Sequence, residues 1–126
     1  MRLVPELREG KYFFGTFSEH QLMAIARHLS YVIAVVRERE GITAVFEERA
    51  KEALSLSAEK VEGPFALISF STITALSEHG ITAKISAALA REKIPSNFFA
   101  GFYHDHVLVP YDMKEKAMAA LLSIEK

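Results

Sequence analysis

The sequence predicts an α+β protein whose two halves each follow the order strand, helix, strand, strand, helix. Short apolar runs of strand length alternate with amphipathic stretches of helical spacing along the 126 residues. In each half, moreover, the second strand of a hairpin leads directly into an acidic-start, Ala/Leu-rich helix, once from Thr43 to Leu54 and again from Val107 to Leu121. These observations indicate a structural repeat within one compact body.

The first half begins with an aromatic strand, Tyr12–Phe17, bounded by Gly10 and Ser18. Ser18 and Gln21 have the spacing of a capping box, which predicts a short helix after them. A hairpin turning at Gly41 and a second helix complete this half. The predicted ranges are strands at residues 31–36 and 42–46 and a helix at 47–56.

The second half follows a polar stretch, residues 57–63, which we interpret as a linker. Its predicted elements are a strand at 65–72, a helix at 81–93, strands at 96–103 and 106–110 around a turn at His104-Asp105, and a helix capped by Asp112. This order, taken twice, is the split βαβ pattern of ferredoxin-like domains. We therefore expect two ferredoxin-like (βαββαβ) units with antiparallel sheets, over residues 1–62 and 63–126.

Composition narrows the classes of function. Fifteen basic and sixteen acidic residues give a net charge of −1, which argues against a nucleic-acid partner. The aromatic residues of the strands are better explained by packing than by base stacking. The chain has no cysteine, no apolar run of membrane-spanning length and no signal-like start. We expect a cytoplasmic protein without a membrane partner.

The stretch from Ser77 to Ile85 is the best candidate for a binding site. It is predicted to be the loop that leaves a buried strand, followed by the first turn of a helix, where backbone N–H groups and the helix dipole favour an anion. Gly80 lets a ligand approach the backbone, and Thr82 offers a hydroxyl. The structural alternative is that Gly80 only turns the chain and Thr82 caps its own helix.

Several runs resemble ACT domains, which bind amino acids and similar effectors. The runs are G-I-T-A-K-I at 80–85, I-P-S-N at 94–97 and A-G-F-Y-H-D-H-V-L-V-P at 100–110, with E-R-E-G-I-T at 38–43 and G-P-F at 63–65. The first two resemble the regulatory units of aspartate kinases. The whole set is similar to small bacterial tandem-ACT proteins related to CASTOR-type arginine sensors.

The resemblance implies a regulatory protein that binds a small effector, plausibly an amino acid, in a cleft between ACT units. Gly80, Ile81 and Thr82 would contact the ligand carboxylate through backbone N–H groups, and Asn97 would face its amine. Ser77 and His79 belong to the same loop and complete the predicted ligand-binding set. Several aspartate-kinase units have Asp at the position of Asn97, so a charge is missing here. We expect a homodimer, no cofactor and no catalysis.

Other residues allow alternatives. His104, Asp105 and His106 are metal-ligand types, but the two imidazoles would share a face only in an extended strand and would lie on opposite arms of a hairpin tip. Such a site would also need a further donor, so we favour a polar turn and predict no metal. A small enzyme using His79, or His104 with Asp105, is a second alternative, although no catalytic motif supports it. A dimerisation module with a degenerate pocket is the third.

Overall fold

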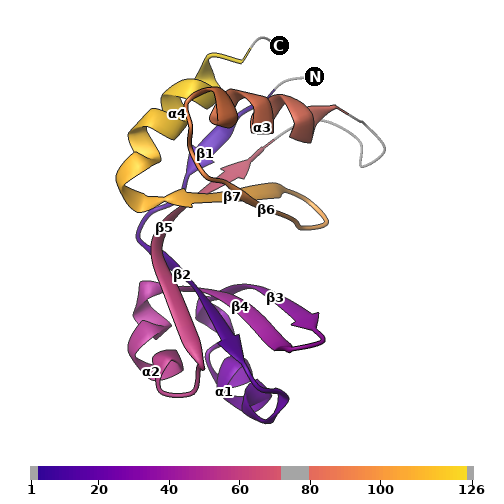
Figure 1. The fold of residues 1–126 in the computed structure, drawn as a ribbon, viewed down its shortest axis with the longest axis vertical. Coiled ribbons are helices and arrows are strands. Elements are labelled where there is room, and N and C mark those ends of the chain that lie inside the picture. The colour runs from indigo at the N-terminus through magenta and orange to yellow at the C-terminus, as the bar shows by residue number, and fades with distance from the viewer. Residues whose placement is uncertain (1–2, 72–79, 125–126) are drawn as a thin grey trace. The chain divides into compact units, whose positions relative to one another are not determined.

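The chain forms two compact units. The computed structural model describes residues 3–71 and 80–124. Unit 1 combines Met1–Glu9 with Phe65–Lys126, and unit 2 is the continuous segment Gly10–Pro64 (Figure 1). Our sequence division at residue 62/63 differs from this grouping because the first nine residues join the C-terminal part of the chain. Both units are of the predicted α+β class.

Unit 2 has the ferredoxin-like order of elements. In chain order they are β2 (Tyr12–Phe17), α1 (Leu22–Arg27), β3 (Val32–Glu38), β4 (Gly41–Glu47), α2 (Lys51–Ser55) and the first residues of β5 (Lys60–Phe70). The strands lie side by side in the order β3-β4-β2-β5. The predicted strand at Tyr12–Phe17 is confirmed without change.

Unit 1 has the same plan with an unexpected source for one strand. Its elements are β1 (Pro5–Leu7), residues 65–70 of β5, α3 (Ile81–Arg91), β6 (Asn97–Ala100), β7 (Asp105–Pro110) and α4 (Lys114–Leu122). The strand order is β1-β5-β7-β6, and all three pairings are antiparallel. β1 therefore occupies the place that the fourth strand of a βαββαβ unit takes after its second helix.

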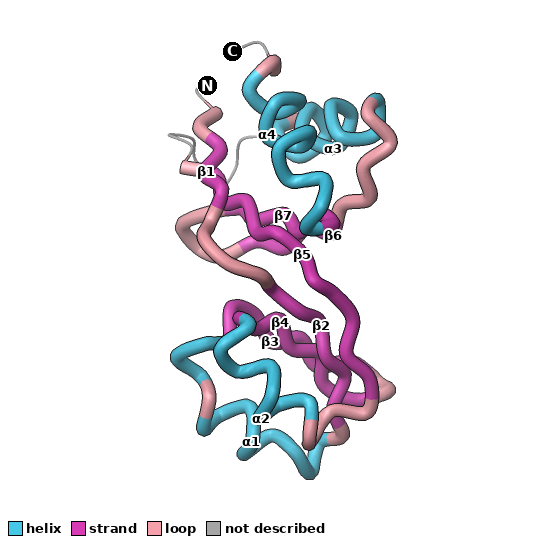
Figure 2. Tube along the Cα trace, turned by 90° about the vertical axis from the view of Figure 1, so that its left-hand side faces the viewer, coloured by secondary structure: helices cyan, strands magenta, loops and turns pink. Residues whose placement is uncertain are grey.

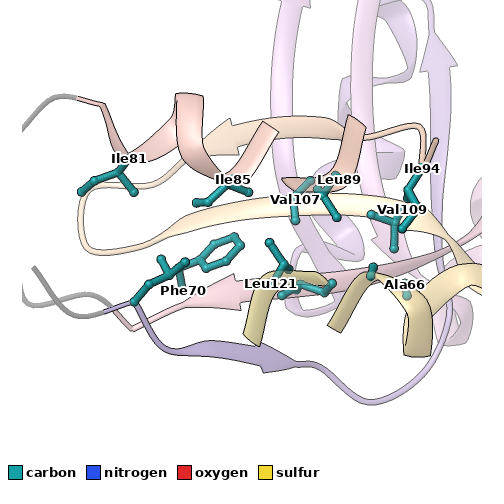
Figure 3. Packing of buried hydrophobic residues seen from close by; sticks show 12 residues of the cluster. Ala66, Phe70, Ile81, Ile85, Leu89, Ile94, Val107, Val109 and Leu121 are labelled. Atoms are coloured by element: carbon teal, nitrogen blue, oxygen red, sulfur yellow. The ribbon is translucent and has the colours of Figure 1, made fainter. Parts of the chain in front are cut away.

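Each unit packs its two helices on one face of its own strands (Figure 2). In unit 1 the buried side chains alternate along the strands, so that Ile68 and Phe70 face the helices. Helix α3 contributes Ile81, Ile85 and Leu89, and Figure 3 shows Leu89 next to Val107 of β7, with Ile81 at the start of the helix. The hydrophobic stripe predicted for this helix is thus confirmed.

The core of unit 2 is more aromatic. Phe13, Phe17 and Phe46 are buried on the helix side, where Phe46 contacts both other rings, and Leu54 of α2 closes over them. Gly15 lies between Phe13 and Phe17 on the same face, where an added Cβ would lie only 2.8 Å from the ring of Phe17. The absence of a side chain at Gly15 is therefore what lets the rings pack.

Several predicted boundaries are wrong for identifiable reasons. The linker at 57–63 is largely strand, since β5 begins at Lys60. A 3-10 turn precedes each of the two helices for which we predicted a cap. Neither Ser18 nor Asp112 makes the predicted side-chain hydrogen bond to the start of its helix. The turn of the last hairpin covers residues 101–104 rather than 104–105: β6 ends at Ala100, three residues earlier than predicted, and β7 begins at Asp105, one residue earlier. The Gly101 N–H donates to the His104 carbonyl at 2.8 Å within this turn.

Candidate functional site

The start of α3 has an open backbone. Gly80 is the N-cap residue, with φ +90°, and among residues 3–71 and 80–124 no atom beyond its chain neighbour lies within 4 Å of the position that a Cβ would take there. The Lys84 N–H donates to the Gly80 carbonyl at 3.1 Å, which leaves the N–H groups of residues 81–83 without partners in the helix. The N-cap residue itself, a glycine, has no side chain that could accept from these groups. This geometry suits an anion next to exposed donors.

The side chains around Gly80 have different roles. Ile81 is buried in the unit 1 core and fixes the first turn of α3 to the sheet, whereas Thr82 is exposed. Thr82, Ala83 and Lys84 are all exposed in the first turn, so the backbone N–H groups there lie beside exposed side chains. Ser77 and His79, the other two loop residues predicted to bind the ligand, lie outside the described residues.

Asn97 does not lie beside Gly80 within unit 1. Helix α3 separates the two residues by its length of about 16 Å, since eleven residues rise 1.5 Å each. Asn97 is exposed at the start of β6 and pairs with Leu108, three registers away from the end of β5 that leads toward Gly80. The β6–β7 hairpin, not Asn97, turns at the Gly80 end of the unit (Figure 1).

Asn97 belongs to the face of the unit 1 sheet that is opposite the helices. Phe98 packs against the helix-side core, so its neighbours Asn97 and Phe99 point the other way. On that face, Phe99 pairs with His106 and His106 pairs with Ser69. We call such a set of residues, paired side by side across neighbouring strands, a rung. Arg8 directly follows β1, and its side chain contacts Ser69 of this rung. We call Arg8, Ser69, His106 and Phe99 the polar row.

The polar row is a connected set of contacts. Arg8 Nη1 donates to Ser69 Oγ at 3.4 Å, and Ser69 Oγ lies 2.8 Å from His106 Nδ1. The His106 ring stacks on Phe99 with centroids 5.0 Å apart and an interplanar angle of 22°. Ser69 is only 5% exposed, and its hydroxyl proton needs an acceptor, which His106 Nδ1 supplies. This assignment places the ring proton of neutral His106 on Nε2.

The surroundings of His106 lower its pKa and so favour the neutral form of the ring. Burial lowers the pKa of His106, and the nearby His104 and Arg8 lower it further, while Asp105 opposes them. The Coulomb contribution of His104 fits its position, with its ring 6.5 Å from that of His106. A neutral imidazole that accepts a hydrogen bond from Ser69 can donate from Nε2 to a ligand.

The two histidines of the hairpin lie on the same arm. His104 directly precedes β7, and its Nδ1–H donates to the Phe70 carbonyl at 3.2 Å. The alternative in which the imidazoles stand on opposite arms is therefore wrong. In the part of the chain that the structure describes, no group of three His, Asp or Glu side chains is placed to hold a metal ion.

No described helix is long and apolar enough to cross a membrane.

Sequence reasoning missed most of the polar row. Of its four members, sequence reasoning singled out only His106, and it did so as a possible metal ligand. One signal was present, because Ser69 interrupts the apolar strand 65–70. Arg8 gave none, since its role depends on β1 joining a strand sixty residues away.

Two sequence segments that overlap at residues 60–62 match ACT-domain family models. One model matches residues 60–123 and another matches residues 1–62. The two units, each with the strand order of a ferredoxin-like domain, are thus a tandem pair of regulatory ligand-binding modules. The chain belongs to the ACT-domain family.

Solved structures agree on the fold. A Vibrio cholerae protein of unknown function, described as a possible transport protein, is 35% identical, with a TM-score of 0.75 over 94% of this chain and 87% of that one. The ligand-free regulatory subunit of aspartate kinase from Thermus thermophilus is 15% identical, with a TM-score of 0.75 over 97% and 96% of the two chains. An Agrobacterium tumefaciens protein is 20% identical, with a TM-score of 0.78 over 97% and 88%. The search of curated proteins found no match.

Proposed function

We propose that the protein is a non-catalytic sensor that binds an amino acid through the exposed start of α3. Membership of the ACT-domain family over both halves of the chain is the observation that carries this proposal. The geometry at Gly80 supports it: beyond its two chain neighbours no atom of the described residues fills the space beside Gly80, and the first N–H groups of α3 have no acceptor within the helix. The ligand carboxylate would take these donors.

The position of Asn97 shapes this proposal. One ligand that touches both Gly80 and Asn97 needs them from two copies of the chain, because α3 separates them within one copy. The predicted homodimer therefore becomes part of the binding model, with the amine of the effector on the Asn97 of the second copy. Binding would then be coupled to association, and the effector would raise the fraction of dimer.

A charge at the start of α3 gives a direct test. Thr82→Glu places a carboxylate in the first turn, where the helix dipole favours it by about 0.3–1 kcal/mol. The fold should therefore be retained, while the new charge repels the ligand carboxylate and weakens amino-acid binding about tenfold or more. Ala87→Glu is the matched control, because Ala87 is exposed on the same helix but far from its start.

Calorimetric titration with each of the common amino acids measures this effect. We expect at least one to bind the wild type and Ala87→Glu alike and Thr82→Glu more weakly. Folded wild-type protein that binds none of them, or equal binding by both variants, contradicts the proposal. Sedimentation with and without the ligand then tests the dimer part separately.

A further inference from the structure

We propose that the polar row is a second binding site, on the helix-free face of unit 1, for a small aromatic carboxylate. Arg8 would bind the carboxylate, the His106 Nε2–H would donate to the same ligand, and the Phe99 ring would contact its planar part. The site is separated from the start of α3 in the same copy, because the unit 1 sheet lies between this face and α3, although Asn97 shares the face with the polar row.

The charge of Arg8 is the first step. A guanidinium carries five N–H donors, and Ser69 Oγ accepts from one of them. Arg8 is exposed, and within residues 3–71 and 80–124 no carboxylate lies within ion-pair distance of its side chain. Guanidinium groups bind carboxylates in a bidentate way. Arg8 is thus a cation that is positioned by a protein contact and still has donors for a ligand.

The second step is that contacts within the polar row hold its side chains in place before a ligand binds. Ser69 is buried and stands between Arg8 and His106, so that the positions of both groups depend on one hydroxyl. The Ser69 contact leaves the proton of neutral His106 on Nε2, a second donor on the same face. Two donors that are held in place before binding cost less ordering entropy than two free surface side chains.

The third step concerns the ring of the ligand. Phe99 is half-buried and already stacks on His106, which leaves part of an aromatic surface next to the donors. Planar rings pack favourably on such surfaces in offset or edge-on arrangements. A benzoate-like molecule combines the charge that suits Arg8 with the ring that suits Phe99.

The charged groups that the structure describes near His106 either favour or oppose the binding of an anion. Arg8 and His104 favour an anion, whereas Asp105 on β7 opposes one but alternates to the other face of the sheet. Glu6 of β1 pairs with Ser69 and shares the face of the row, so it also opposes an anion. Removing this charge with Glu6→Gln should therefore strengthen carboxylate binding, a gain that a purely structural row would not show.

The test uses benzoate as the probe, with benzamide and acetate as comparisons, and the NMR signals of histidine-labelled full-length protein. Benzoate should shift the His106 ring signals and raise the His106 pKa, because a bound carboxylate stabilises the imidazolium. Benzamide lacks the charge and should leave the pKa unchanged, and acetate lacks the ring and should bind more weakly. Wild-type His106 signals that do not respond to benzoate overturn the proposal, whatever the variants do.

Variants separate the site from a nonspecific charge effect. Arg8→Gln should weaken benzoate binding about tenfold or more, as expected for loss of a charge-assisted contact. Arg91→Gln is the matched control, because Arg91 is an exposed arginine at the end of α3 on the helix side. Equal benzoate affinity in these two variants overturns the proposal. The benzoate test is read from the His106 signals with no amino acid present, and the amino-acid test is read from calorimetric heat with no benzoate present, so failure here and failure of the amino-acid site are distinguishable.

Discussion

The two units share a backbone plan but differ on the face away from their helices. The rung that holds Ser69 and His106 in unit 1 corresponds, counting back from the buried phenylalanine that ends the first strand, to Thr16 and Thr43 in unit 2. There the rung continues to Val36 of β3, and Thr43 donates to Glu38 at 2.5 Å. Unit 2 thus satisfies its rung with an exposed surface contact and has no cation or imidazole on it.

The first helices of the two units differ as well. Helix α3 has eleven residues and starts directly at a left-handed glycine, whereas α1 has six and follows a 3-10 turn. Among the helices that the structure describes, α3 of unit 1 is the one that begins at a residue with positive φ. The two units thus share a strand order but differ in how their first helix begins, and both of our proposed sites lie in unit 1.

The largest expected effect comes from glycines that serve the two units differently. At Gly41 of unit 2 φ is +151°, and an added Cβ would lie 2.4 Å from the Phe17 carbonyl oxygen. Gly41→Ala should destabilise the protein by about 3 kcal/mol, combining backbone strain with overpacking. Gly80→Ala meets no atom of the described residues beyond its chain neighbour within 4 Å, and its strain should cost only about 1–2 kcal/mol.

Urea unfolding of the two variants measures this difference. If Gly80→Ala proved as damaging as Gly41→Ala, the space next to Gly80 would not be open in solution, and the amino-acid site would lose its main geometric support. The proposed site needs that space for the ligand.

Element type was predictable where the local pattern decides it. The aromatic run Tyr12–Phe17 and the stripe of Ile81, Ile85 and Leu89 specify a strand and a helix through burial alone, and both are confirmed. β1 was missed because three residues carry no periodicity, and it becomes a strand only by pairing with residues 68–70 of β5. Such long-range pairing leaves no local trace in the sequence.

The candidate site was predictable only in part, for the same reason. Gly80 could be found from its place before a helical stripe. Its separation from Asn97 depends on the direction of α3 and on the pleat of β6, which are tertiary facts. The relation between Arg8 and Ser69 depends on β1, and the one local hint was a serine in an apolar strand.

A smaller effect is expected from the matched rungs of the two units. Ser69→Ala removes a buried hydroxyl and leaves both Arg8 and His106 Nδ1 without their partner, at a cost of about 1–2 kcal/mol. Thr43→Val removes a contact with the exposed Glu38 and should change stability by less than about 0.5 kcal/mol. Equal costs, measured by urea unfolding, would mean that the two rungs do not differ in the way the contacts indicate.

The smallest effect is a pH dependence confined to unit 1. Because the pKa of His106 is lowered in the folded protein, the unfolded chain takes up the proton first, and stability is lost as pH falls below about 6.5. Above that pH, His106 is neutral in both the folded and the unfolded chain, and its full contribution to stability is present. His106→Gln should therefore lose less stability between pH 7.5 and 5.5 than the wild type, as measured by urea unfolding at both pH values. The same comparison for Thr43→Val should match the wild type, since that rung of unit 2 has no imidazole. An equal loss in all three proteins would place the titrating group elsewhere and leave His106 without the environment that the polar row gives it.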